Sequence, residues 1–274
     1  MRGATEERLR VAIELARAAG DLTLAYFRRR VEVETKKDGS PVTVADRGAE
    51  ALIRERLAAR FPRDGVLGEE FGHTPGTSGF EWILDPMDGT ISFVRGVPLY
   101  GTLIGVTHAG EPGGGGGSSA AGTVAGVIHM PALDEMVYAH RGGGCWHAVG
   151  GGEPARCRAS GAASLGDALV AMTDPNLFAR HRPGSFGALG GACRAMRGWS
   201  DCYAHLLVAT GRADAAVEPI VSVWDVAPMP VIMEEAGGVF FDWTGGGRID
   251  AGHAASCAPG IAGALRGLLG PFAG

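Results

Sequence analysis

The chain has 274 residues, of which 46% are hydrophobic and 20% charged, and this composition is ordinary for a soluble globular protein with one large domain or two smaller ones. The formal net charge of −5 argues against a nucleic-acid binder, because that function usually needs a basic face. No segment approaches the roughly 18 to 20 continuous apolar residues of a membrane span, and residues 1–17 mix acids and arginines where a signal peptide would be apolar.

Five cysteines are scattered along the chain and never stand in a C-x-x-C spacing: Cys145, Cys157, Cys193, Cys202 and Cys257. Their odd number and their spacing favour reduced thiols over disulfides or a zinc site. We therefore expect a cytoplasmic protein that has neither a membrane nor a nucleic acid as its partner.

The first predicted elements are two amphipathic helices. Apolar residues recur at helical spacing over residues 5–29, and a second helix is expected over residues 46–61. Asp46 stands at the start of this second helix, where an acid commonly caps free N–H groups. Between the helices, residues 31–33 predict a short strand and residues 36–41 a turn-rich loop.

The most informative stretch of the chain is Trp82-Ile83-Leu84-Asp85-Pro86-Met87-Asp88-Gly89-Thr90. Its three leading apolar residues predict the end of a buried strand, and Pro86 predicts a tight turn that holds Asp85 and Asp88 rigidly. Gly89 lets the backbone approach an anion closely, and a helix that opens after Thr90 would offer that anion free N–H groups. The combination indicates a site for a metal and a phosphate, and the alternative is an acidic surface turn.

Beyond this stretch the pattern changes to short strands. Apolar runs at residues 99–107, 122–129 and 135–139 predict a meander of antiparallel strands, with the glycine run 113–117 as a flexible hairpin tip. The polar, glycine-rich stretch 149–161 indicates a domain boundary.

The last part of the chain mixes strands and helices. Strands are expected at 168–172, 192–197, 213–218 and 239–242, helices at 201–210 and 225–236, and a loop between the first two strands. Pro228 and Pro230 fall inside the last helix, and Pro230 should distort it because a proline beyond the first turn removes a hydrogen bond. Strands first and mixed elements afterwards indicate an α+β protein.

Three motifs occur in an order that resembles the inositol monophosphatase superfamily of magnesium-dependent, lithium-sensitive phosphatases: Gly68-Glu69-Glu70, Asp85-Pro86-Met87-Asp88-Gly89-Thr90, and Trp224-Asp225-Val226-Ala227 followed by Glu235-Ala236-Gly237-Gly238. The resemblance implies a five-layer αβαβα sandwich and a homodimer. Residues 1–150 would then form an N-terminal α+β domain with most of the metal ligands. Residues 151–274 would form a C-terminal α/β domain with Asp225 and the substrate-specificity residues.

The resemblance also implies an active site with two or three Mg²⁺ ions. Glu69, Asp85 and the backbone carbonyl of Met87 would hold one ion, and Asp85, Asp88 and Asp225 would hold another. Glu69 would in addition assist the attack of water on the phosphate. The substrate would be a small-molecule phosphate ester.

Further residues receive roles from the same resemblance. Thr90, oriented by Asp46, would help to take the proton of the attacking water. The N–H groups of Gly89 and Thr90 would bind the phosphate beside Asp88. Lys36 looks like the lysine of the family's active-site loop.

The residues themselves support a magnesium site. Unit charges about 4 Å apart interact by roughly 4 kcal/mol at an effective dielectric constant near 20, so several converging carboxylates need a compensating charge. Hard divalent cations prefer oxygen ligands, and the absence of a Cys/His cluster at metal spacing in the sequence favours Mg²⁺ over Zn²⁺. Other phosphatase motifs are missing from the sequence, and Arg180-His181-Arg182 is interpreted as a solvated loop.

Substrate specificity is expected from Arg197, Ser200, Asp201 and Glu218. The inositol enzymes have small residues where this chain has Asp201, and a second carboxylate near Glu218 would suit a substrate with an amine or imidazole cation. The segment 199–203 is similar to the histidinol-phosphate phosphatase branch, which implies hydrolysis of histidinol phosphate to histidinol in histidine biosynthesis. The alternatives are an inositol-1-monophosphatase or broad sugar-phosphate phosphatase, an inactive metal-binding scaffold and, for Asp201 alone, a helix N-cap.

Overall fold

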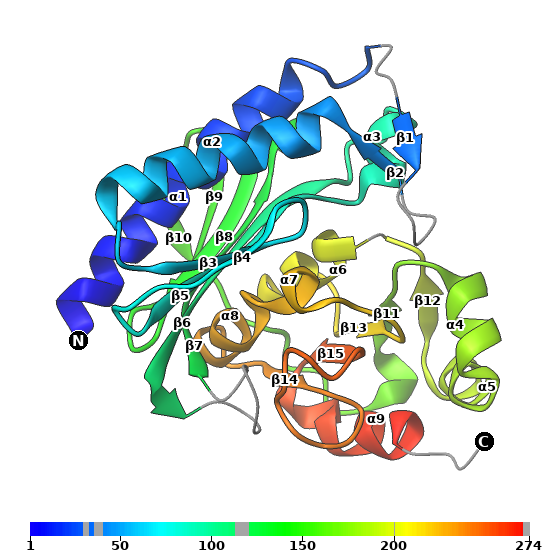
Figure 1. The fold of residues 1–274 in the computed structure, drawn as a ribbon. Coiled ribbons are helices and arrows are strands. Elements are labelled where there is room, and N and C mark those ends of the chain that lie inside the picture. Colours follow the sequence, from blue (N-terminus) through cyan, green and yellow to red (C-terminus); the bar gives the residue numbers. More distant parts are fainter. Residues whose placement is uncertain (30–32, 36–40, 113–120, 200, 271–274) are drawn as a thin grey trace.

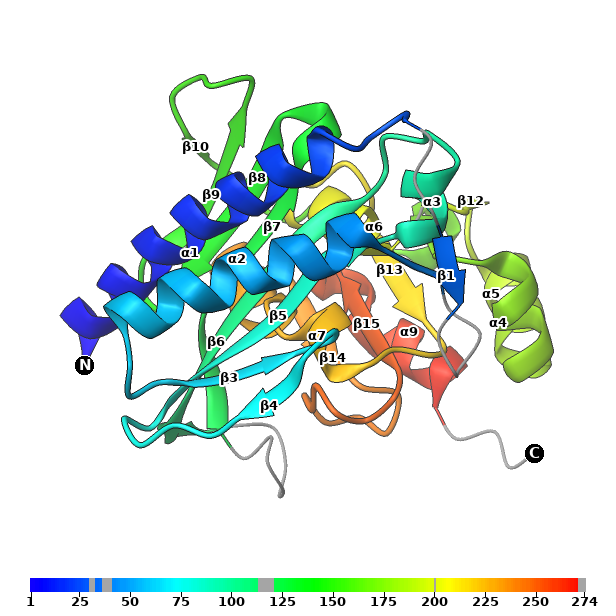
Figure 2. The same cartoon turned by 45° about the horizontal axis from the view of Figure 1, so that its top comes forward.

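Two β-sheets and three groups of helices form five layers in the computed structural model, which describes residues 1–29, 33–35, 41–112, 121–199 and 201–270 (Figure 1). Helices α1 (Arg2–Leu24) and α2 (Val44–Arg60) lie side by side across one face of the larger sheet, as Figure 2 shows. The middle layer contains α6 (Asp201–Ala209), α7 (Val223–Val226) and α8 (Met229–Glu235). Helices α4 (Pro175–His181), α5 (Pro183–Ala192) and α9 (Ala262–Leu269) cover the second sheet.

The larger sheet has eight strands in the order β10-β9-β8-β7-β6-β5-β3-β4. From β5 to β10 the neighbours pair antiparallel, which is the predicted meander, whereas β3 pairs parallel with β5. The strands are β3 (Gly65–Gly68), β4 (Gly72–Thr74), β5 (Phe80–Asp88), β6 (Gly101–Pro112), β7 (Ala121–Met130), β8 (Glu135–His140), β9 (Gly144–Val149) and β10 (Ala155–Arg156). The predicted hairpin tip at 113–117 lies outside the described residues.

The second sheet has five strands in the order β12-β11-β13-β15-β14. They are β11 (Leu169–Ala171), β12 (Ala195–Arg197), β13 (Ala215–Glu218), β14 (Val239–Phe241) and β15 (Ala254–Cys257). Strand β11 pairs parallel with both β12 and β13, so these three strands end at the same edge of the sheet. In the described parts of the chain, the remaining regular elements are β1 (Val33–Thr35), β2 (Pro41–Thr43), α3 (Thr90–Val94) and three short 3₁₀ helices (Pro131–Leu133, Leu165–Asp167 and Pro259–Ile261).

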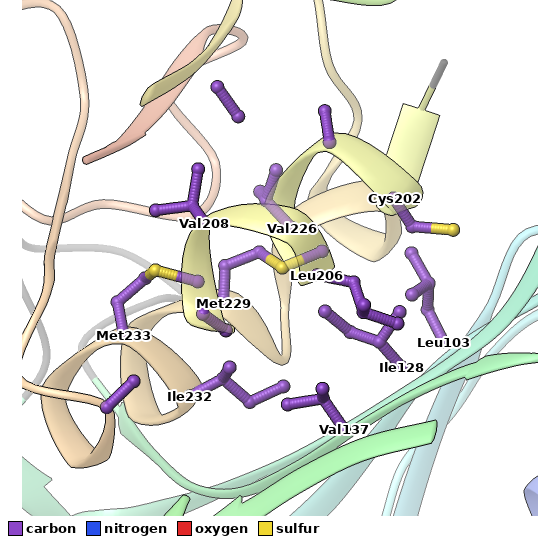
Figure 3. Close-up of a cluster of buried hydrophobic side chains, with 14 of the residues drawn as sticks. Leu103, Ile128, Val137, Cys202, Leu206, Val208, Val226, Met229, Ile232 and Met233 are labelled. Carbon is purple, nitrogen blue, oxygen red and sulfur yellow. The ribbon is translucent and has the colours of Figure 1, made fainter. Parts of the chain in front are cut away.

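Three large hydrophobic cores among the described residues hold the layers together, and a fourth, smaller cluster contains Met87 and Tyr100. The alternation of side chains along the strands supplies apolar residues to the large cores. Ile104 packs under α1 and α2, whereas its neighbour Leu103 faces the middle layer, as expected for a strand that is buried on both faces. Figure 3 shows this middle core, where side chains of the large sheet meet those of α6, α7 and α8. Phe178 and Leu189 belong to the third core, outside the second sheet. The predicted αβαβα sandwich is therefore confirmed.

The second helix begins at Val44, and Thr43 is its N-cap. Asp46 is the third residue of the helix, so its prediction as the N-cap is wrong. The two residues form a capping box, in which the Thr43 hydroxyl accepts the N–H of Ala45 at 3.1 Å and the Asp46 carboxylate accepts the N–H of Thr43 at 2.8 Å. The first helix ends at Leu24, before the predicted residue 29, and most of the predicted strand 31–33 lies outside the described residues.

The predicted loop between β11 and β12 is also wrong, because the helices α4 and α5 occupy it. Asp174 caps α4 by accepting the N–H of Asn176 at 2.7 Å, and a proline begins each helix. The segment Arg180-His181-Arg182, interpreted from the sequence as a solvated loop, is the end of α4 and the start of α5. None of the helices in the described parts of the chain is long and apolar enough to cross a membrane.

The predicted helix 225–236 is broken into two pieces, as the prolines require. Helix α7 ends at Val226, and α8 begins at Met229 with Pro228 as its N-cap. Pro230 therefore stands in the first turn of α8, where a missing N–H costs no hydrogen bond. The expected helix is thus interrupted, but the break precedes Pro230, so the expectation that Pro230 itself distorts a helix is wrong.

A pair of glycines on the large sheet accommodates this break. Gly105 of β6 lies opposite Gly126 of β7. A Cβ atom at Gly105 would lie 2.7 Å from the Cβ of Ala227, and one at Gly126 would lie 2.7 Å from the carbonyl oxygen of Pro228. The hydroxyl of Thr123 donates to the carbonyl oxygen of Ala227 at 3.1 Å, so the broken helix keeps a partner for this buried group.

We predict that Gly105→Ala lowers the free energy of unfolding by about 1 to 3 kcal/mol, because the added methyl group overpacks the contact with Ala227. Urea unfolding measures the effect. Gly263→Ala is the control, because a methyl group added to Gly263 in α9 would have nothing within 4 Å, and the change should be neutral or stabilising by up to about 1 kcal/mol. Equal effects of the two changes would contradict the close-contact argument.

Candidate active site

Strand β5 carries Asp85 and Asp88 to the edge of the middle layer. The strand continues through Pro86 to Asp88, so the predicted tight turn at Pro86 is wrong. Its pairing with β6 shifts register between Asp85 and Asp88, which is a bulge, and a proline is tolerated there because that position makes no ladder hydrogen bond. The hydroxyl of Thr102 donates to the carbonyl oxygen of Pro86 at 3.0 Å and fixes the bulge.

Gly89 follows the bulge and is the N-cap of α3. Its φ of +85° lies in the left-handed region, and a Cβ atom would meet the carbonyl oxygen of Leu99 at 2.9 Å and the carboxylate of Asp201 at 3.0 Å. A glycine is therefore required for two independent reasons. The helix does open at Thr90, as the sequence predicts.

Asp225 reaches the same place from the other half of the chain. It is the third residue of α7, and its carboxylate accepts the N–H of Ser222 at 2.7 Å. Asp85, Asp88 and Asp225 each offer an oxygen, and these three oxygens all lie within 4.8 Å of one another. The structure thus brings together three of the predicted metal ligands.

Burial and mutual repulsion both disfavour the charged forms of the carboxylates in this cluster. Burial raises the pKa of Asp85 well above its ordinary value, and the charges of neighbouring acids, Glu69 first among them, raise it further. Burial likewise raises the pKa of Asp88 well above its ordinary value and that of Asp225 to about 7. A divalent cation would relieve both effects, and a donor set of oxygen atoms alone fits Mg²⁺.

Glu69 follows β3 and lies near this cluster, since its charge raises the pKa of both Asp85 and Asp225. Its N–H donates to the carbonyl oxygen of Leu84 at 3.2 Å and continues the pairing of β3 with β5. The buried Glu50 of α2 holds the following turn, because its carboxylate accepts the N–H groups of Glu70 at 2.7 Å and Phe71 at 3.2 Å. Sequence reasoning missed Glu50, although its place on the inward face of the helix was a signal.

Thr90 lies where Asp46 can orient it. Its hydroxyl oxygen is 3.2 Å from an Asp46 carboxylate oxygen and 3.2 Å from the carbonyl oxygen of Met87. The other Asp46 oxygen accepts the hydroxyl of Thr43 at 2.6 Å. The predicted neighbours Asp46, Met87 and Thr90 are therefore together beside the acidic cluster.

The predicted specificity residues are only partly brought together. Asp201 begins α6 and Glu218 ends β13, and the charge of Asp201 raises the pKa of both Asp88 and Glu218, in each case after burial. Arg197 is exposed, and its guanidinium donates to the carbonyl oxygen of Met196 at 2.8 Å, away from the cluster. Lys36 and Ser200 lie outside the described residues.

Two neighbouring hollows lie beside the acidic cluster. A cavity of about 450 Å³ is lined by Glu69, Gly89, Thr90, Thr173, Asp201 and others. A smaller one of about 70 Å³ is lined by Asp88, Thr173, Asp201, His205, Glu218 and Asp225 among others. Because Asp201 and Thr173 line both, the two hollows meet at these residues. The larger hollow has room for a small phosphate ester.

Cys202 and Thr173 contact the predicted site residues. Sequence reasoning placed both in segments similar to the histidinol-phosphate phosphatase branch but assigned neither an individual role in the site. The backbone N–H of Cys202 donates to the carboxylate of Asp88 at 2.6 Å, which links α6 to β5. The N–H of Thr173 donates to the carboxylate of Glu218 at 3.0 Å. Backbone donors leave no mark in a sequence, so these contacts had no signal to find.

The order of motifs and this geometry agree with a family comparison. The model of the inositol monophosphatase family matches residues 4–265. The chain belongs to the inositol monophosphatase family. The family prediction is thereby confirmed, and so is the prediction of a phosphoric monoester hydrolase.

Several proteins are similar to this chain over most of their length. A protein named histidinol-phosphatase from Chlorobaculum parvum is 43% identical over 242 residues, which cover 86% of each chain. One of the same name from Mycobacterium tuberculosis is 39% identical over 234 residues, which cover 84% of this chain and 85% of the relative. Among solved structures, the extragenic suppressor protein suhB from Bartonella henselae has a TM-score of 0.84 at 28% identity, covering 96% of this chain and 98% of that one.

We predict that Asp88→Asn abolishes the binding of Mg²⁺ but leaves the protein folded. The change removes a charge without changing volume, and the amide oxygen can still accept the N–H of Cys202. The metal-free variant should be at least as stable as the wild type, because repulsion within the cluster decreases. Mg²⁺ should raise the melting temperature of the wild type only, and Mg²⁺-dependent turnover of the variant should be abolished. Full turnover in the variant would remove Asp88 from the metal site.

A second prediction concerns His205, which is 2% exposed and whose Nδ1 lies 2.7 Å from the hydroxyl oxygen of Ser256. Burial lowers its pKa to about 4, whereas an unfolded histidine titrates near 6.5. Its stabilising contribution is therefore complete above pH 6.5 and is lost as the pH falls toward 4, because the unfolded chain binds the proton first.

The comparison of wild type with His205→Gln isolates this contribution from that of the carboxylates. The difference in free energy of unfolding between the two proteins should shift by about 3 kcal/mol against the wild type between pH 7 and pH 4. Urea unfolding across this pH range measures it. A constant difference would show that the folded protein accepts the proton without penalty.

Proposed function

We propose that this phosphatase depends on Mg²⁺ and hydrolyses histidinol phosphate to histidinol and phosphate. The substrate assignment rests on the position of Asp201, whose carboxylate lies beside the acidic cluster and in the same hollow as Glu218. Relatives at 43%, 39% and 36% identity are named histidinol-phosphatase, and this supports the proposal.

Five groups would hold the metal ions, of which we expect two or three: the carboxylates of Glu69, Asp85, Asp88 and Asp225 and the backbone carbonyl of Met87. Bound Mg²⁺ supplies charge neutralisation and Lewis-acid activation of water and of the phosphoryl group. The carboxylates fit this role because burial and mutual repulsion disfavour their charged forms, and a bound cation would relieve both effects.

The residues around the ions would orient the phosphate and move a proton. The N–H groups of Gly89 and Thr90, at the open end of α3, point to a phosphate-binding role, since helix N-termini bind anions. The hydroxyl of Thr90 is directed by Asp46, so its oxygen can accept a proton from the attacking water while its own proton passes toward that carboxylate. Glu69, which lines the same hollow as Thr90, would assist the attack of the water.

The substrate end of the site would select a cation. A buried carboxylate that meets a protonated amine or imidazolium forms a charge-assisted hydrogen bond, which is stronger than one between neutral groups. Glu218 is 5% exposed, and burial raises its pKa well above its ordinary value, so it gains from a cationic partner. Asp201 supplies the second carboxylate.

An inositol-1-monophosphatase is the second candidate within the same chemistry. Its support is a relative from Rhizobium meliloti that is named inositol-1-monophosphatase and is 32% identical over 248 residues. An inactive scaffold is disfavoured, because all four predicted carboxylate ligands are present in the chain. We further propose a cytoplasmic, lithium-sensitive homodimer, and the five free thiols are consistent with a reducing compartment.

A panel assay tests the substrate. Purified enzyme with Mg²⁺ should hydrolyse histidinol phosphate at least tenfold more efficiently, by kcat/KM, than inositol 1-phosphate, fructose 1,6-bisphosphate or adenosine 3′,5′-bisphosphate. A preference for inositol 1-phosphate would favour the second candidate.

We predict that Asp201→Asn lowers kcat/KM for histidinol phosphate by about tenfold or more relative to inositol 1-phosphate, because one charge-assisted contact is worth about 1.5 to 3 kcal/mol. Asp174→Asn is the matched control, since Asp174 is an exposed acid that lines the same large cavity. Asp174→Asn should change kcat/KM for both substrates to the same extent. Equal losses on both substrates in Asp201→Asn would discredit the charge argument.

A further inference from the structure

Three parallel strands of the second sheet end at the substrate side of the site. Strand β11 lies between β12 and β13 and is parallel to both. Residues that follow parallel strands gather at one edge of a sheet, and ligands of α/β proteins bind there. Glu218 ends β13, Asp201 begins the helix after β12, and Thr173 stands two residues beyond β11.

Thr173 contacts both acids through two different groups. Its backbone N–H donates to a carboxylate oxygen of Glu218 at 3.0 Å. Its hydroxyl oxygen accepts the backbone N–H of Asp201 at 3.0 Å. Thr173 also lines both hollows of the site, so the central strand of the three links the two flanking acids.

The backbone of Asp201 needs such a link. Its φ of +48° lies in the left-handed region, which residues other than glycine rarely adopt without local support. This conformation places the carboxylate of Asp201 3.0 Å from the point that a Cβ atom of residue 89 would occupy. The hydrogen bond to the Asp201 N–H therefore helps to hold the backbone conformation from which its carboxylate approaches Gly89.

We propose that Thr173 is a positioning residue for substrate selection, which holds Asp201 through its hydroxyl group and Glu218 through its backbone so that the two carboxylates face the cation of the substrate together. The inference rests on the proposed function, because it presumes a phosphate ester that carries an amine or imidazole. Thr173 is not required to touch the phosphorus or the metal ions. Its removal should therefore affect recognition of the cation more than the chemical step.

Two substitutions separate the hydroxyl group from the rest of the side chain. Thr173→Val keeps the β-branched shape and the backbone N–H to Glu218 but removes the acceptor for Asp201. Thr173→Ser keeps the acceptor and is the matched control. We expect Thr173→Val to raise KM for histidinol phosphate about tenfold more than KM for inositol 1-phosphate, with a smaller change in kcat, and Thr173→Ser to restore most of the loss.

Inhibition by histidinol gives an independent readout, because histidinol carries the cation without the phosphate. Its inhibition constant against inositol 1-phosphate turnover should rise about tenfold in Thr173→Val and little in Thr173→Ser. Equal losses on both substrates, or equal damage by Val and Ser, would overturn the positioning role. If the wild-type enzyme shows no preference for histidinol phosphate and no inhibition by histidinol, the proposed substrate fails and the inference with it. If the wild-type preference for histidinol phosphate is unchanged in Thr173→Val, the positioning role of Thr173 is wrong but the proposed substrate stands.

Discussion

Repulsion among closely spaced, partly buried carboxylates is the constraint on which this structure depends. Asp85, Asp88 and Asp225 place oxygens within 4.8 Å of one another, and at this distance like charges in a partly buried site oppose one another by several kcal/mol. The fold must supply the rigidity that keeps them together. Two of the acids stand on strand β5, in the interior of the large sheet, and the third stands on the short helix α7. The residues between α7 and α8 pack directly against Gly105 and Gly126 of that sheet.

Each acid of the cluster also receives one backbone donor, and each donor comes from a different element. Asp85 accepts the N–H of Met87 at 3.0 Å, Asp88 that of Cys202 at 2.6 Å, and Asp225 that of Ser222 at 2.7 Å. Such bonds favour the charged form of a carboxylate, but burial outweighs them here, since the pKa of every member is raised. The donors therefore orient the carboxylates, and a cation is needed to neutralise them.

The sequence could predict features that depend on local patterns, but not those that depend on contacts between distant segments. Spacing within the run from Asp85 to Thr90 is a local pattern, and it indicated a site for a metal and a phosphate. Asp225 was assigned to that site only through the resemblance to the family's ordered motifs. The bulge at Pro86 looked like a turn because a proline after a strand has the same local signature in both cases. Contacts between distant segments, such as Glu50 with the turn after Glu69 or Thr173 with Asp201, follow from tertiary packing and have no local pattern.

Asp201 shows why recognition and catalysis are coupled in this arrangement. Its carboxylate approaches Gly89, on the phosphate side, and its charge is the largest electrostatic contribution, after burial, to the raised pKa of Asp88. A cation bound by Asp201 and Glu218 would oppose that contribution, and so would favour the ionised form of Asp88, which is the form that we expect to bind Mg²⁺. A neutral polyol phosphate would supply no such cation. For the proposed substrate, recognition of the cation and loading of the metal site therefore reinforce each other through a single carboxylate.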